Sequence, residues 1–277
     1  MSLILNAKGG GADLETENRS FSPEQMMETL QLAAQMIMES GGETFRAEET
    51  VCRMGKGFGL QQVESFAVPS GLFISFRTAE GRLETSVKRA HPGQTDLTKV
   101  DQVNQISRLA AAGRLAPEEA LRRLKALDAI RKTPAGWGAL GAAAVCAAGF
   151  CLLFQGGWRE TLMASGLAVL VQGIRLFSVR IHGHGIFSNI LGGLLTAFLP
   201  ALAAGWIPGL MTETVVAGAL MPLVPGVAMA NAVQDGLRGD TFSGLSHGAQ
   251  ALMTACLIAG GALLSPALLR LLKGGGL

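Results

Sequence analysis

Charged residues are scarce in the second half of this chain. Of its 44 Asp, Glu, Lys and Arg residues, 34 lie in residues 1–132 and 10 in the 145 residues that follow. A charged side chain at the centre of a bilayer costs several kcal/mol, so long stretches without charge are typical of membrane-spanning helices. The sequence therefore predicts two environments, water for the first part of the chain and lipid for the second.

Other scarce features exclude further classes of protein. The four cysteines include no Cys-x-x-Cys pair, and nothing suggests disulfides. The net charge is only +2 and basic residues are interleaved with acids, so no nucleic-acid partner is expected. There is no phosphate-binding loop, and no cofactor is expected. His182-Gly183-His184 has the spacing of metal ligands, but no acid or cysteine lies near it, so we predict no metal site.

Four uncharged runs reach the roughly 20 residues that a helix needs to cross a bilayer. They hold 26, 32, 21 and 29 residues, at 133–158, 181–212, 214–234 and 241–269. A fifth run, from Thr161 to about Phe177, contains Arg175, whose long side chain can reach the headgroups from near a helix end. We expect an α-helical membrane domain at 133–277 with five transmembrane helices, at about 135–157, 161–179, 186–208, 214–234 and 244–270.

The first 132 residues carry the pattern of a tail and a soluble domain. Residues 1–20 are expected to be a disordered tail, and 21–132 a cytoplasmic α+β domain with the order αα-βββ-αα. Ser22-Pro23-Glu24-Gln25 has the N-cap, the first-turn proline and the glutamine of a helix start. Alternating apolar and polar residues at 72–77 predict a strand.

The distribution of Lys and Arg predicts the orientation. Most of them lie before the first span and beside the second and fourth loops, which favours the cytoplasmic side for these segments. The N-terminus is then expected inside and the C-terminus outside. Residues 3–5 are too short an apolar stretch for a signal peptide, so none is expected.

Two prolines and a glycine fall within the fourth expected span. Pro222, Pro225 and Gly226 should break the helix near the middle of the uncharged run, because proline lacks a backbone donor and clashes with the preceding turn. A half-helix starting after Pro225 would direct free amides at a carboxylate, with Asn231 completing the polar shell and Asp235 available for proton coupling. The alternatives are a proline kink satisfied by neighbouring helices and, for Asp235, an acid in a cytoplasmic loop.

Four more polar residues lie inside the expected spans. Arg175 could hold a carboxylate through two parallel hydrogen bonds, or it could simply extend to the cytoplasmic headgroups. Gln172, Asn189 and Thr196 could add ligands in the same cavity, or form hydrogen bonds between helices.

Two readings from other functional classes remain. One is a membrane-anchored sensor or scaffold, although anchoring needs one span and not five. The other is a hydrolase, because Gly244-Leu245-Ser246-His247-Gly248 matches a nucleophile-elbow pattern. That chemistry needs a strand-to-helix turn, whereas here the pattern opens a membrane helix, and Gly-x-x-x-Gly is typical of close helix packing. We therefore predict no enzyme.

Four short motifs stand out along the chain. They are Ser40-Gly41-Gly42-Glu43-Thr44, Val68-Pro69-Ser70-Gly71, Gln155-Gly156-Gly157-Trp158, and Leu223-Val224-Pro225-Gly226 with the downstream Asn231, Asp235, Gly239 and Ser243-Gly244. Together they resemble the threonine/serine exporter family. The likeness covers most of residues 23–272. Within the family the chain looks like the larger component of a split transporter, similar to the subunit of a two-component succinate exporter that carries the cytoplasmic domain.

This resemblance implies a subunit of a secondary transporter in the bacterial cytoplasmic (inner) membrane. It would export threonine or serine by alternating access, with succinate or another dicarboxylate as the alternative substrate. The implied partners are a small carboxylate substrate, membrane lipid and a second, short five-span subunit of the same family, in a hetero- or homo-oligomer.

Overall fold

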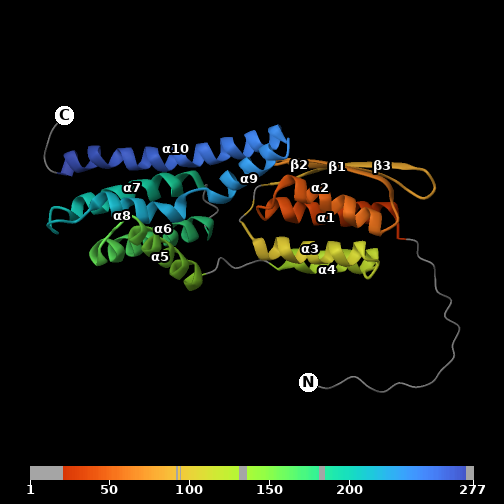
Figure 1. The fold of residues 1–277 in the computed structure, drawn as a ribbon, viewed down its shortest axis with the longest axis horizontal. Helices are drawn as coiled ribbons and strands as arrows, with labels where there is room; N and C mark the ends of the chain where they lie inside the picture. Colours follow the sequence, from red (N-terminus) through yellow and green to blue (C-terminus); the bar gives the residue numbers. More distant parts are fainter. Residues whose placement is uncertain (1–20, 92, 94, 131–135, 181–184, 273–277) are drawn as a thin grey trace, which may run out of the picture.

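The computed structural model describes residues 21–91, 93, 95–130, 136–180 and 185–272. It is mostly helical, with one three-stranded antiparallel sheet near the N-terminal end (Figure 1). The tail at 1–20 and the histidines of 182–184 lie outside the described residues, so the predictions made for them are not addressed. The first part contains α1 (Pro23–Glu39), α2 (Thr44–Gly57), β1 (Gln61–Val68), β2 (Gly71–Arg77), β3 (Leu83–Arg89), α3 (Leu97–Ala111) and α4 (Pro117–Ala129).

This order confirms the predicted αα-βββ-αα pattern, and local chemistry explains it. Ser22 caps α1, since its hydroxyl accepts from the N–H of Gln25 and the Gln25 side chain accepts from the N–H of Ser22. The helix ends at Glu39, and two residues later Gly41 has a φ of 79°, which suits a residue without a Cβ. This glycine turns the chain directly into α2.

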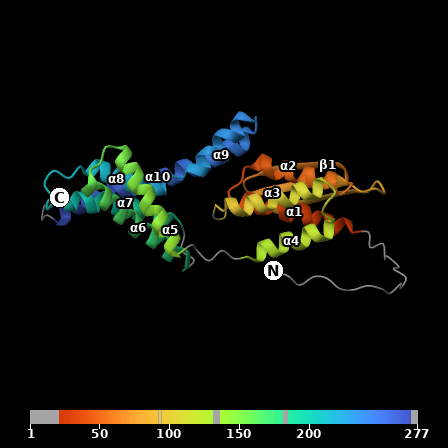
Figure 2. The ribbon, with the colours of Figure 1, turned by 60° about the horizontal axis from the view of Figure 1, so that its bottom comes forward.

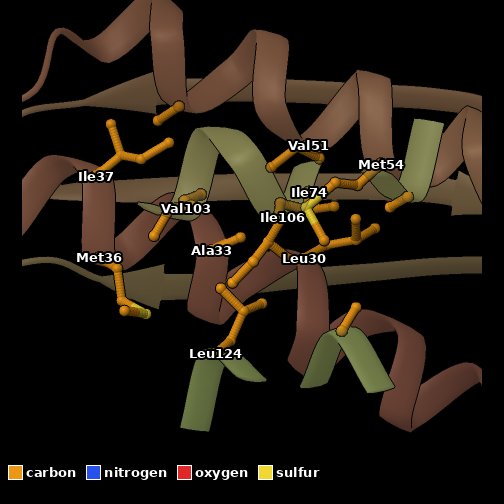
Figure 3. Packing of buried hydrophobic residues seen from close by; sticks show 14 of the residues in the cluster. Leu30, Ala33, Met36, Ile37, Val51, Met54, Ile74, Val103, Ile106 and Leu124 are labelled. Carbon is orange, nitrogen blue, oxygen red and sulfur yellow. The ribbon is translucent and has the colours of Figure 1, made fainter. Parts of the chain in front are cut away.

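The sheet covers the helices with one face. Strand β2 lies between β1 and β3, and Phe73 is paired with Phe66 on one side and Val87 on the other. Alternate residues of β2 point inward, so Phe76 is 0% exposed whereas Phe73 is 44% exposed. Inside, side chains from α1, α2, α3, α4 and the sheet meet in one apolar cluster (Figure 3).

The second part is a bundle of helices with little charge. Four helices are long and apolar enough to cross a membrane, namely α5 (Gly136–Leu153), α6 (Trp158–Arg180), α7 (Gly185–Ala203) and α10 (Thr241–Leu272). Between α7 and α10 lie α8 (Thr212–Leu220), a 3-10 turn η1 (Met221–Leu223) and α9 (Gly226–Leu237). The α8–η1 and α9 segments are bent by 64°, and they give a fifth span if the bent pair counts as one.

The predicted break in the fourth span is present, and the helices on its two sides pack against different neighbours. The helix α8 packs against α5, α6 and α7, whereas α9 packs against α10. Figure 2 shows α9 leaving the bundle toward α2. The 3-10 turn places Leu223 between Val171 and Ile258, so the break itself is anchored inside the bundle.

All the long helices differ by several residues from the expected spans. Helix α6 begins at Trp158 and not at 161, and α7 ends at Ala203 and not at 208. The end of α5 and the start of α10 have local causes. Helix α5 ends at Leu153 because Gln155 has a φ of 63° and the N–H of Gly156 returns to the carbonyl of Cys151, which closes the last turn. Helix α10 begins at Thr241 and is 32 residues long. The carboxylate of Asp240 accepts from the N–H of Ser243 and caps this helix start.

Candidate functional site

The α9–α10 hairpin meets the first part of the chain at the junction between α1 and α2. The side-chain amide of Asn231, on α9, donates to the carbonyl oxygen of Gly41 at 3.3 Å. One turn further along α9, Asp235 is 0% exposed. Residues nearly 200 positions apart in sequence thus form one buried polar contact, and a buried carboxylate is stable only with hydrogen-bond partners.

Asp235 has such a partner on each side. The hydroxyl of Thr44, the first residue of α2, donates to Asp235 Oδ1 at 3.2 Å. Nδ1 of His247, on α10, lies 2.9 Å from Asp235 Oδ2. The side chain of His247 is 12% exposed. The same Thr44 hydroxyl lies 3.4 Å from Asp240 Oδ2, and since it has one proton, the two carboxylates compete for it.

Helix periodicity and one glycine explain why these groups meet. Val227, Asn231 and Asp235 are four residues apart, so they share one face of α9. Gly244 lets α10 approach α9, because a Cβ there would lie 3.0 Å from the carbonyl oxygen of Ala232. The close-packing reading of the Gly-x-x-x-Gly motif is therefore confirmed at its first glycine, and the close approach brings His247 to Asp235.

A cavity of about 110 Å³ lies at this junction. This volume has room for several water molecules or one small metabolite. Its polar wall includes Thr44 and Thr95 from the first part and Asn231, His247 and Gln250 from the hairpin. The remaining lining residues are apolar or glycine: Met38, Gly41, Gly42, Pro69, Gly93, Val227 and Ala228.

Several carboxylates surround the junction. Burial is the largest influence on Glu48 and raises its pKa, the N–H of Ala67 lowers it through a 2.7 Å hydrogen bond, and Asp240 and Asp235 raise it again, so that the pKa stays above its usual range. Glu43 pairs with Arg46 at 2.6 Å. The guanidinium of Arg238 lies over the ring of Phe45, 3.2 Å from its centre. Both arginines thus have partners of their own.

The residues predicted at the helix break have mixed positions. Asn231 and Asp235 lie one turn apart on α9 and face the junction with α1 and α2. Pro225 is half-buried and Gly226 is exposed, and neither lines the cavity. The two residues that follow them, Val227 and Ala228, belong to the first turn of α9 and do line it.

The other predicted ligands lie away from this cavity. Gln172 and Arg175 on α6 and Asn189 on α7 are half-buried in the bundle and do not line it. Thr196 is buried, but its hydroxyl donates within α7, to the carbonyl oxygens of Gly192 and Gly193 at 2.9 and 3.0 Å. Thr196 therefore has its own partners in this structure.

Sequence reasoning missed Thr44, Gly41 and His247 as members of one site. The first two were visible only as part of a family-like motif, and His247 only inside a nucleophile-elbow pattern. The structure places Ser246 and His247 in the first two turns of α10, where adjacent residues point to different faces, and not on a strand-to-helix turn. Among the described residues, no group of three or more His, Cys, Asp and Glu side chains is placed to hold a metal ion.

Comparison with known proteins shows which family the chain resembles. Residues 28–269 match a family model, ThrE, described as "Putative threonine/serine exporter". The chain is 26% identical over 216 residues to the "Probable succinate transporter subunit YjjP" of Escherichia coli, covering 76% of this chain and 82% of that one. It is 28% identical over 153 residues to the "Threonine/serine exporter" of Corynebacterium glutamicum, covering 52% of this chain and 30% of that one. No solved structure matches.

Proposed function

Because the chain belongs to the threonine/serine exporter family, we propose that it is a subunit of a secondary transporter that exports small carboxylate-bearing metabolites. The several long apolar helices support a multi-pass membrane protein. L-threonine and L-serine are the substrates that the family description favours. Succinate is the second candidate, favoured by the match to most of the length of a succinate transporter subunit.

The length of α10 supports a position for the junction outside the hydrocarbon core. Its 32 residues span about 48 Å, whereas the core is about 30 Å thick. His247 lies roughly 38 Å from the end of α10 at Leu272. If the C-terminal end of α10 lies at one membrane surface, the junction cavity lies just beyond the other.

We place the first part of the chain, residues 21–132, in the cytoplasm. Figure 1 shows the C-terminal end of α10 at the end of the bundle farthest from the sheet. The sheet and the C-terminal end of α10 then lie on opposite sides of the membrane, which requires an odd number of crossings. The bent α8–α9 pair therefore acts as one broken span, and residues 133–277 cross the membrane five times. Lys and Arg lie mainly beside the segments on the sheet side, which favours the inner face of a bacterial cytoplasmic membrane.

A second subunit completes the transporter in this proposal. The chain covers only 30% of the Corynebacterium exporter, and the Escherichia relative is named a subunit. A five-span unit has its ends on opposite sides, so a related unit can lie inverted against it, the architecture that builds many secondary transporters. We expect the partner to be a short five-span membrane protein of the same family.

The junction cavity is the proposed cytoplasmic entry site for the substrate. Val227 and Ala228, in the first turn of α9, line the cavity, and the positive end of a helix favours a carboxylate near it. Asn231 supplies an amide, and Asp235, paired with His247, couples transport to a proton. Gln172, Arg175, Asn189 and Thr196 are proposed for a later position along the route through the bundle, while alternating access moves the substrate outward.

The observation that carries this proposal is the cavity itself, where residues of two family-like motifs far apart in sequence form one polar wall. The test is efflux of labelled threonine, serine and succinate from cells that express the chain alone or with a neighbouring small membrane protein. Asn231→Ala should abolish most efflux, whereas Gln234→Ala, an exposed position on the same helix, should not. Equal efflux from both variants would place the substrate elsewhere. No efflux from folded protein, with or without the neighbour, would favour a sensor or scaffold.

A further inference from the structure

The ring of His247 lies between a buried carboxylate and the cavity. Nδ1 of the ring is 2.9 Å from Asp235 Oδ2, and the residue is part of the cavity wall. Within the described residues, no hydrogen bond reaches the other ring nitrogen, Nε2. A carboxylate that holds one nitrogen of a histidine fixes the ring orientation and leaves the other nitrogen for a ligand.

We propose that protonated His247 binds the carboxylate of the exported metabolite through Nε2, and that Asp235 positions the ring. This inference rests on the proposed function and names a residue for it. When Asp235 accepts from Nδ1–H, a neutral ring has a lone pair on Nε2, which repels a carboxylate. Uptake of one proton turns Nε2 into a charged donor, so carboxylate and proton bind together.

The charges around the ring support this assignment. The carboxylates near the junction come from α9 (Asp235), the α9–α10 turn (Asp240) and α2 (Glu48). Glu43 pairs with Arg46, and Arg238 lies over Phe45. Neither arginine lines the cavity, and His247 is the only described lining residue that can carry positive charge. Without a protonated His247, this surrounding acidity would repel an anionic substrate.

The shared chemistry of the candidate substrates is a carboxylate next to a short polar or apolar chain. Threonine, serine and succinate all have this group, and their amides lack its charge. The direct test is binding of labelled threonine and succinate to the purified full chain, alone and with its partner subunit, between pH 6 and pH 8. Threoninamide and succinamide serve as the probes that lack a carboxylate.

We expect both acids to bind and both amides to fail. Because the proposal requires a proton on His247, affinity should fall as the pH is raised. His247→Gln should weaken binding about ten- to hundredfold at pH 6 and remove the pH dependence. His247→Arg should keep binding at pH 8, and Ser246→Ala, the neighbouring residue, should behave as the unaltered protein.

Each outcome separates the inference from the proposed function. Acid binding that is unchanged in both affinity and pH profile by His247→Gln would overturn the role of His247 and leave the exporter assignment intact. Amides that bind as tightly as acids would overturn carboxylate recognition. If neither acid binds to folded protein, the proposed function fails and the inference fails with it. Should His247→Gln not fold, the pH series and the amide comparison on the unaltered chain still decide.

Discussion

The interiors of the two parts of this protein are built from side chains of different size. In the first part the largest fully buried side chains include Leu30, Met54 and Phe76. In the bundle the largest are only valines, Val171 and Val215, and Val215 lies among small buried residues such as Ala147 and Ala164. Water drives large apolar groups inside, whereas lipid is as apolar as they are, so helices in a membrane associate through close backbone packing. The difference in core composition therefore supports the assignment of two solvents.

Glycine replacement in the bundle should have the largest effect. A Cβ at Gly193 on α7 would collide with the backbone carbonyl of Ile258 on α10. The two helices cannot pack with a side chain there, so Gly193→Leu should give no folded protein by gel filtration in detergent. Gly260→Leu is the control, because a Cβ at Gly260 meets no atom within 4 Å. Folded Gly193→Leu would show that small residues do not hold this bundle.

Truncation of a large side chain should have the next largest effect, and in the first part only. Phe76→Ala removes a fully buried ring and should lower the free energy of unfolding by about 3–5 kcal/mol. Phe73→Ala, on the outer face of the same strand, should cost much less. Thermal unfolding of the full chain compares the two, and equal losses would mean that the outer face of the sheet is covered as well.

The contact between the two parts should contribute less. Thr44→Val keeps the shape of the side chain and removes its hydrogen bond to Asp235, so we expect a loss of about 1 kcal/mol. Hydrogen exchange of the α9 amides should rise at the same time. Thr50→Val is the matched control in the same helix, since the Thr50 hydroxyl is buried without a hydrogen bond to the described residues. A loss at Thr50 equal to that at Thr44 would contradict this role.

The smallest effect should come from Glu48. Its pKa is raised, so the folded protein keeps the proton to higher pH than the unfolded chain, and stability falls as the pH rises from the ordinary glutamate pKa through the raised one. Glu48→Gln keeps an oxygen for the N–H of Ala67 and cannot ionise. It should raise the melting temperature slightly at pH 7 and flatten its pH dependence, whereas Glu80→Gln, in an exposed turn, should change neither.

Local signals in the sequence were sufficient for most elements. The capping box at Ser22 predicted α1, alternation predicted β2, and the prolines at 222 and 225 predicted the broken span. These features depend on interactions within a few residues. The end of α5 and the start of α10 were less predictable. A left-handed backbone conformation at Gln155 ends α5, and a cap at Asp240 starts α10. The length of an uncharged run indicates neither feature.

The site was only half predictable for a related reason. Asn231 and Asp235 carried a polar signal within an apolar run, and both face the junction. Their partners Gly41 and Thr44 are nearly 200 residues away, and a single sequence holds no information on such a pairing. His247 carried a misleading signal, because a motif defined by spacing gave it Ser246 as a neighbour although its structural partner is Asp235.

Because α10 is one continuous helix, a tilt of its part inside the bundle displaces its distant end. Ile258 packs against Leu223 inside the bundle, and His247 lies about 16 Å further along the same rigid rod. A change in tilt of about 20°, the size of an ordinary membrane-helix tilt, would swing that distant end by about 5 Å. Because α9 packs on α10 and moves with it, such a displacement exceeds the 3.2 Å contact of Thr44 with Asp235 across the junction. Small rocking of α10 within the bundle would thus open the junction with no moving loop in between.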